Sequence, residues 1–283
     1  MASTWHTVAT KDVRLLKRQM NQLSELPKDY IFLNYLRCHD DIGWGLDYDW
    51  LKKFGISEIP QKKFLNDYFT GKFPDSNARG ELYNNDPRLG DARLCGTTAS
   101  LCGIEAALED KDTDKLEKSI DCDIMLHAYM LTQSGIPVLY SGDEIGQLND
   151  YSYHDNPEKS VDSRYLHRGK FNWKLAENCD DSDTVQGRIF QSILKLEKCR
   201  AENEVFRAEA DFQTVDTGSD SVLGICREYE NKKLLAYFNF SDNPQSVFLD
   251  GVKSGRDLFT DDEVCSISIE LKPYGFSWLL LDE

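Results

Sequence analysis

Apolar residues recur at helical spacing in three stretches of the chain, which predicts helices over residues 8–26, 116–131 and 189–196. The positions that carry this spacing are Val13, Leu16, Met20, Leu23, Leu116, Ile120, Ile124, Ala128, Leu131, Ile189, Ile193 and Leu196. Leu26-Pro27 ends the first helix, because a residue before proline avoids the helical conformation, and Gly135 ends the second.

Two short, nearly continuous apolar runs lie between these helices. Residues 30–35 (YIFLNY) and 136–140 (IPVLY) are typical of parallel strands buried on both faces. Polar clusters follow both runs at once, at residues 37–41 (RCHDD) and 141–144 (SGDE). Polar groups just beyond the C-terminal ends of parallel strands are where barrel enzymes hold their chemistry.

The regions after these clusters have weaker periodicity. Residues 42–95 are rich in Gly, Asp, Asn and aromatic residues, with one helix expected near residues 61–68. A second loop rich in polar residues and tyrosine runs from residue 146 to about residue 183. Long ordered loops in compact enzymes commonly carry function.

After about residue 204 the apolar period changes from helical to two. Strands are expected at residues 222–229, 234–240, 246–249, 266–271 and 276–281. This pattern predicts an antiparallel, sandwich-like domain of about eighty residues. The first part, in contrast, has α/β order with only two parallel strands, whereas a barrel needs eight. Either the fold is small and unusual, or most of a barrel is missing upstream.

Composition excludes several classes of protein. The chain has 283 residues, 40% of them hydrophobic, and a formal charge of −16, which argues against binding nucleic acid or an anionic membrane. A neutral substrate such as a sugar is compatible with that charge. No run approaches the ~18 apolar residues of a membrane helix, and the first ten residues do not resemble a secretory signal.

The eight cysteines form no CxxC pair and no zinc-like spacing with histidine. We interpret them as reduced thiols of a cytoplasmic protein, with a disulfide framework as the alternative. No motif requires a metal or an organic cofactor.

A string of motifs resembles the α-amylase superfamily (glycoside hydrolase family 13) in the form that amylosucrases carry. The motifs, in chain order, are NYLRCHDDIGW (34–44), ARG (78–80), GDAR (90–93), GT (96–97), YSGDEIG (140–146), LND (148–150), DSRYLHR (162–168), NFS (239–241) and LKPY (271–274). The His-Asp dipeptide alone is a weak signal, but the extended string is specific.

The resemblance implies a fold class of α/β, with the C-terminal portion of a (β/α)8 TIM barrel over residues 1–203. Residues 42–95 would be a subdomain inserted after strand seven, and residues 204–283 the C-terminal β-sandwich. In this family the nucleophilic aspartate follows strand four and the general-acid glutamate follows strand five. Neither position has a counterpart in this sequence.

The resemblance also assigns site residues. Asp40 matches the third carboxylate of the family, which stabilises the transition state, and His39 would donate to the same sugar ring. Asp41 would contact the fructose side of sucrose, and Arg93 would line the acceptor side. Arg164 matches an arginine that pairs with a pocket-floor aspartate outside this sequence.

Each assignment has a structural alternative. Asp41 could be an exposed loop residue, Arg93 could pair with Asp91 or Glu105, and Arg164 could pair with Asp162. Asp143 and Glu144 look like supports of the site rather than a substitute catalytic pair. Most of the aromatic residues that could stack on sugars are expected to pack inside the inserted loops; they are Trp44, Tyr48, Trp50, Tyr151 and Tyr153.

Two functions from different classes follow. The first is an amylosucrase-like enzyme that transfers or hydrolyses the glucosyl group of sucrose by a retaining mechanism, with a glucan as acceptor and the missing carboxylates supplied by a complementary N-terminal part. Trehalose or maltose isomerisation is a nearby possibility. The second is a non-catalytic fragment or pseudoenzyme that at most binds sugar.

Overall fold

The first predicted helix is in fact two helices in the computed structural model, which describes residues 1–252 and 254–282. α1 (Ala2–Thr10) and α2 (Arg14–Ser24) are separated at Lys11, whose φ of +58° no helix accommodates. The Asp12 carboxylate accepts the backbone N–H of Arg14, the first residue of α2, at 2.9 Å. The expectation of one helix over residues 8–26 was therefore wrong.

The chain divides into two compact units, each built from separate stretches of sequence. The first unit contains Met1–Ala9, Tyr35–Asp123 and Leu139–Gln191, and the second contains Thr10–Asn34, Ile124–Val138 and Ser192–Glu283. The boundary between the barrel portion and the β-sandwich, which the sequence predicts near residue 204, remains a prediction.

Parallel strands of the predicted barrel lie in the second unit. β1 (Leu33–Asn34) and β5 (Ile136–Pro137) form a two-stranded parallel sheet in which Leu33 pairs with Ile136. The predicted burial of this pair was wrong, because Leu33 is 62% exposed and Ile136 is 54% exposed. Among the described strands, none pairs with the outer edges of β1 and β5. The two runs have the apolar composition of a buried sheet, but no other strand in the described part of the chain extends this sheet, and these side chains are exposed.

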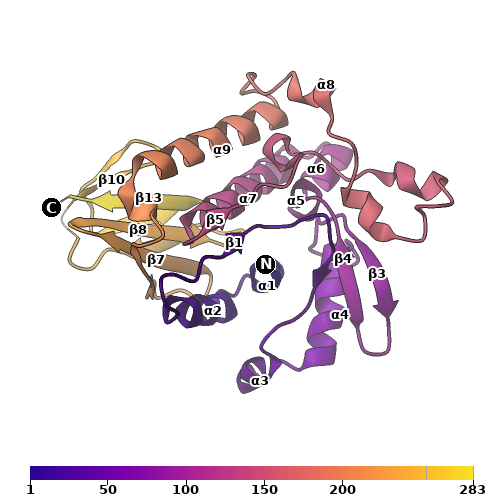
Figure 1. The fold of residues 1–283 in the computed structure, drawn as a ribbon, viewed down its shortest axis with the longest axis horizontal. Coiled ribbons are helices and arrows are strands. Elements are labelled where there is room, and N and C mark those ends of the chain that lie inside the picture. The colour runs from indigo at the N-terminus through magenta and orange to yellow at the C-terminus, as the bar shows by residue number, and fades with distance from the viewer. Residues whose placement is uncertain (253, 283) are drawn as a thin grey trace. The chain divides into compact units, whose positions relative to one another are not determined.

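The β-domain of the second unit has two sheets. The larger has the strand order β11-β10-β13-β8-β7-β6, and Figure 1 shows β13 between β10 and β8. The smaller pairs β9 with β12. The bounds are β6 (Asp211–Val215), β7 (Val222–Tyr229), β8 (Lys232–Asn239), β9 (Gln245–Phe248), β10 (Gly255–Asp257), β11 (Glu263–Val264), β12 (Ser268–Leu271) and β13 (Phe276–Leu281). Every pairing in these sheets is antiparallel, as the period-two pattern predicts.

Alternating residues of these strands form one apolar core. Leu235 and Tyr237 of β8 pack with Val247 of β9 and Leu271 of β12, so the two sheets face one another as in a sandwich. Three strands escaped the sequence prediction, namely β6, β10 and β11. β10 and β11 are only three and two residues long, too short to show a period.

A small antiparallel sheet replaces the irregular excursion expected in the first unit. Its strands β2 (Ile42–Gly43), β4 (Asp91–Cys95) and β3 (Glu81–Asp86) lie in the order β2-β4-β3. The predicted helix near residues 61–68 is confirmed as α4 (Glu58–Phe69). Trp44 stacks on Phe69 of this helix, with ring centroids 5.7 Å apart, and its indole N–H donates to Asn66 Oδ1 at 2.8 Å.

The remaining helices include the two other predicted ones. These are α7 (Thr113–Thr132) and α9 (Val185–Glu202), both longer than their sequence patterns. The shorter α-helices are α3 (Tyr48–Leu51), α5 (Thr98–Leu101), α6 (Ile104–Asp110) and α8 (Trp173–Ala176). The 3-10 helices are η1 (Lys52–Phe54), η2 (Asp143–Ile145), η3 (Tyr151–Asp155), η4 (Ser163–His167) and η5 (Glu204–Phe206). None of the helices in the described part of the chain combines the length and the apolar character of a membrane span.

Candidate functional site

Side chains hold the backbone of residues 35–41, the segment that follows β1. Trp5 Nε1 donates to the Leu36 carbonyl at 2.8 Å, and the indole is fully buried. The His39 carbonyl accepts two donors, Arg168 Nε at 2.6 Å and His167 Nε2 at 3.3 Å. Hydrogen bonds from side chains distant in the sequence therefore order this segment, whereas a strand would be held by backbone hydrogen bonds to a neighbouring strand.

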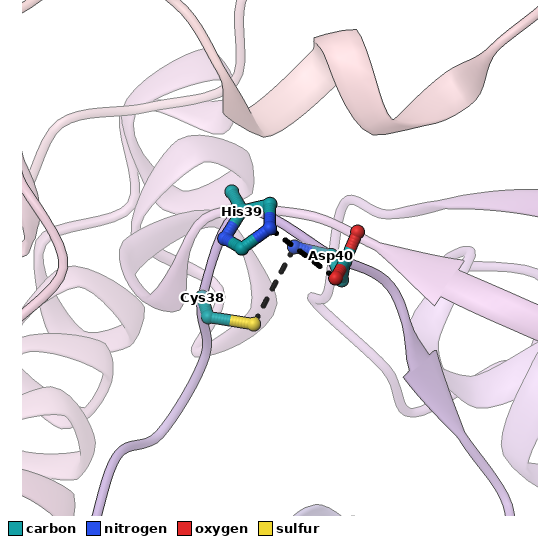
Figure 2. Close-up of side chains that lie close together, drawn as sticks. All are labelled: Cys38, His39 and Asp40. Atoms are coloured by element: carbon teal, nitrogen blue, oxygen red, sulfur yellow. Dashed lines mark hydrogen bonds and ion pairs between the residues drawn. The ribbon is translucent and has the colours of Figure 1, made fainter.

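Asp40 lies among three basic side chains. Its Oδ1 is 3.3 Å from Arg164 Nη1 and 3.4 Å from Arg168 Nη2, and its Oδ2 is 3.3 Å from His39 Nε2. Figure 2 shows the His39 ring and the Asp40 carboxylate turned toward one another. Both side chains are more than half exposed, so a ligand can reach them from solvent.

Asp162 is the principal partner of Arg164. The contact is bidentate, with Arg164 Nε to Oδ1 at 2.8 Å and Nη2 to Oδ2 at 2.9 Å. The hydrogen bonds from Arg164 hold the pKa of the Asp162 carboxyl below its ordinary value. The alternative pairing with Asp162 is thus present, and Arg164 is not an unpaired arginine waiting for a distant aspartate.

A buried ion pair joins the two predicted strand-end clusters within the first unit. Arg37 Nε donates to Asp143 Oδ1 at 2.8 Å, and the side chains are only 2% and 3% exposed. The Arg37 guanidinium also lies 4.5 Å from the centroid of the Tyr140 ring. Glu144 accepts the Gly142 N–H at 2.7 Å. Both acidic residues are engaged with protein groups, which fits a supporting role.

His167 connects the inserted sheet to the strand-end segment. Its Nδ1 accepts the backbone N–H of Gly96 at 3.1 Å, while Nε2 faces the His39 carbonyl. Since a backbone N–H can only donate, Nδ1 carries no proton and Nε2 carries it. Burial, together with the positive charge of Arg37, lowers the pKa of His167 to about 4. The ring therefore stays neutral near pH 7, as this bonding pattern requires.

Asp41 immediately precedes β2, and Arg93 lies on the neighbouring strand β4. Arg93 Nε is 4.0 Å from Asp41 Oδ1, at the outer limit of an ion pair. Asp91, one expected alternative partner, lies 3.5 Å from Lys62 Nζ. Gly43 gives Arg93 its room, because a Cβ at that position would collide with the guanidinium. The structure thus brings two predicted binding residues together and leaves Arg93 half exposed.

Cys38, His39 and Asp40 gather three potential metal ligands within 4.8 Å of one another. The cluster does not fit a divalent cation, because Arg164 and Arg168 already direct positive charge at the Asp40 carboxylate. Cys38 Sγ accepts the Asp40 N–H at 3.4 Å. All eight cysteines lie among the described residues, and each is a free thiol.

The aromatic residues of the inserted loops mostly pack. Trp44 and Tyr153 are 3% and 4% exposed, and the Tyr153 hydroxyl bonds to the Glu81 carboxylate. Tyr48 donates to the Trp44 carbonyl at 2.8 Å. Tyr151 is 42% exposed and is therefore more accessible to solvent than Trp44 and Tyr153.

Sequence reasoning gave no role to His167, Arg168 or Arg37, although the resembling motifs contain all three. The sequence signal that could have identified these three residues is the high density of charged residues in their two motifs. Each polar segment pairs its acids with basic residues, in RCHDD at 37–41 and in DSRYLHR at 162–168. Such clusters predict interaction between two loops, but the sequence does not reveal which atoms meet.

Known proteins match both parts of the chain. Residues 212–278 match the family model described as maltogenic amylase, C-terminal domain. Glucosylglycerate phosphorylase from Escherichia coli (strain K12) is 28% identical over 278 residues, which are 97% of this chain and 46% of that protein. The chain thus spans about half the length of this relative.

A solved structure shows a similar fold over part of the chain. A variant of AmyP in complex with maltotriose has a TM-score of 0.50 and 16% identity, covering 60% of this chain and 38% of that one. Trehalose-6-phosphate hydrolase (TreA) from Bacillus licheniformis has a TM-score of 0.44 and 19% identity, covering 57% and 39%, a similarity too low to bear on the fold. The matched family model is named for a maltogenic amylase and the matched relative is a phosphorylase, so these similarities do not point to an amylosucrase in particular.

Proposed function

We propose that this chain, which resembles the C-terminal region of α-amylase superfamily proteins, contributes the sugar-orienting half of a retaining α-glucoside enzyme. The observation that carries the proposal is the cluster around Asp40. An exposed carboxylate beside His39, fixed by Arg164 and Arg168, offers both acceptors and donors to sugar hydroxyls. A developing oxocarbenium charge would be stabilised by the Asp40 carboxylate.

The nucleophile and the general acid would come from an N-terminal barrel segment. The surface for it is the β1–β5 sheet, where exposed apolar side chains extend from Tyr30 and Ile31 to Val138. Parallel sheets occur almost only with both faces covered, so a further layer of β/α structure suits this surface. In the relative from Escherichia coli, 54% of the length (100 − 46) has no counterpart in this chain, which is room for such a segment.

The glucosyl acceptor distinguishes amylosucrase-like transfer from phosphorolysis. Sucrose with a glucan acceptor is the choice that the motif string favours. Inorganic phosphate is the second candidate, because Arg164 and Arg168 present guanidinium groups beside Asp40, and guanidinium forks suit phosphate. The name of the phosphorylase relative agrees with this second candidate.

The test is binding and turnover by the purified chain, with circular dichroism and size-exclusion chromatography as checks on folding. We expect maltose to bind, Asp40→Ala to abolish that binding, and no glucose or fructose to appear from sucrose, with or without phosphate. Asp75→Ala, a change at an exposed aspartate of the same unit, should bind like the wild type. Release of glucose that depends on Asp40 would show that the chain builds a complete catalytic site alone.

A further inference from the structure

We propose that His167 and Arg168 are positioning residues. Their hydrogen bonds to the His39 carbonyl fix the orientation in which His39 and Asp40 face a bound sugar. The purpose of this role rests on the proposed function. The hydrogen bonds that define it do not depend on that function. Neither side chain needs to touch the sugar. Each would act through the backbone of the dipeptide.

Both side chains donate hydrogen bonds to the carbonyl oxygen of His39. Two donors, Arg168 Nε and His167 Nε2, converge on this one oxygen at 2.6 and 3.3 Å. Two hydrogen bonds fill both lone pairs of a carbonyl oxygen. The peptide plane between His39 and Asp40 is therefore held against rotation, and the directions of both side chains depend on that plane.

Each donor is itself anchored. His167 is 4% exposed, and its Nδ1 accepts the Gly96 N–H at the end of β4. Arg168 extends from the carbonyl to Asp40 Oδ1 at 3.4 Å and toward Asp162 Oδ2 at 3.9 Å. The dipeptide is thus connected to the inserted sheet on one side and to the 162–168 loop on the other.

The neutral state of the imidazole matters to this arrangement. Burial and the charge of Arg37 keep the ring unprotonated, so Nδ1 remains an acceptor and Nε2–H remains a donor. A glutamine side chain also offers one acceptor and one donor, whereas leucine has a similar size and offers neither. His167→Gln and His167→Leu therefore form a matched pair of variants.

A nuclear magnetic resonance experiment on the full 283-residue chain reads the carbonyl directly. Carbon-13 carbonyl labelling of histidine with nitrogen-15 labelling of aspartate selects only His-Asp peptide bonds, of which the sequence has two, His39-Asp40 and His154-Asp155. The Asp155 signal is the internal control for folding. We expect His167→Leu and Arg168→Met to shift the His39 carbonyl signal, while His167→Gln and Arg168→Lys keep it near the wild-type position.

Maltose titration of the same samples tests whether the hydrogen bonds to the His39 carbonyl affect sugar binding. His167→Leu should weaken maltose binding roughly tenfold, about the worth of one lost hydrogen bond, and His167→Gln should recover most of that loss. An unchanged His39 carbonyl signal in His167→Leu and Arg168→Met overturns the positioning role, whether or not maltose binds. If the variants show the carbonyl shifts but the wild-type chain does not bind maltose, the proposed function is overturned and the positioning role stands.

Discussion

Arg37 and Asp143 form a fully buried ion pair between two motifs that lie 106 residues apart in the sequence. The pair links the segment that carries Asp40 to the turn after residue 140. A buried pair adds little net stability over an apolar pair of similar size, but the loss of one partner leaves a buried charge uncompensated.

Single substitutions in this pair should therefore destabilise the chain strongly. Arg37→Met or Asp143→Leu should lower the free energy of unfolding by about 3–5 kcal/mol. The double variant should recover much of that loss, because it leaves no charge behind. Urea unfolding measures the cycle, and Arg88→Met, at an exposed arginine paired with Asp86, is the control expected to change little. Additive losses in the double variant would contradict the coupling.

The low pKa of His167 predicts a stability loss in mild acid. The unfolded ring titrates near pH 6.5 and the folded ring near pH 4, so the unfolded chain binds more protons between these values. Stability from this group is complete above about pH 6.5 and declines as pH falls toward 4, by up to about 3 kcal/mol. Unfolding measured between pH 4 and 7 tests this slope. His167→Gln should flatten it, and a slope unchanged in that variant would assign the effect to other groups.

Arg227 is a buried cation held by neutral acceptors. Its guanidinium donates to the carbonyls of Val205, Thr132 and Arg207 and to the Ser134 hydroxyl, and burial lowers its pKa to about 9. Arg227→Ala leaves these groups unsatisfied, so we expect a loss of about 3 kcal/mol in unfolding free energy. Arg256→Ala, at an arginine that is 60% exposed, is the control. Equal effects of the two changes would refute the structural role of Arg227.

Thiol reactivity should separate the cysteines by burial. Cys265 is exposed, whereas burial raises the pKa of the Cys226 thiol to about 11. We expect iodoacetamide at pH 7.5 to modify Cys265 first and Cys226 only after denaturation, because the thiolate is the reactive form. Peptide mass spectrometry follows both sites, with Cys265→Ser as the control that removes the fast phase. Early modification of Cys226 would show that its strand opens in the native state.

The sequence predicted those elements whose pattern is local. Residues 222–229 and 276–281 are short, largely apolar runs flanked by turn residues, and they form β7 and β13 at the same bounds. The break at Lys11 was missed, since the apolar spacing continues through it and only a backbone angle reveals it. Residues 30–35 were misjudged because their burial depends on neighbouring layers that the pattern presupposes.

The candidate site was predictable only as a set of segments. The His-Asp-Asp string marks the strand end, and the 162–168 motif marks its neighbour. Which donor meets which acceptor was not predictable, because His167 and Arg168 reach the His39 carbonyl from 128 and 129 residues away. Contacts at that separation depend on tertiary packing and leave no periodic trace.

The open face of β1 and β5 also has a consequence for the protein in a cell. Tyr30, Ile31 and Leu33 form a short run of exposed apolar side chains, which is the feature that molecular chaperones bind in incompletely assembled polypeptides. Copies whose face stays uncovered would be held by chaperones or degraded. The steady-state abundance of this chain would then follow the supply of the N-terminal segment proposed to cover this face, so the turnover rate of the protein would report on assembly.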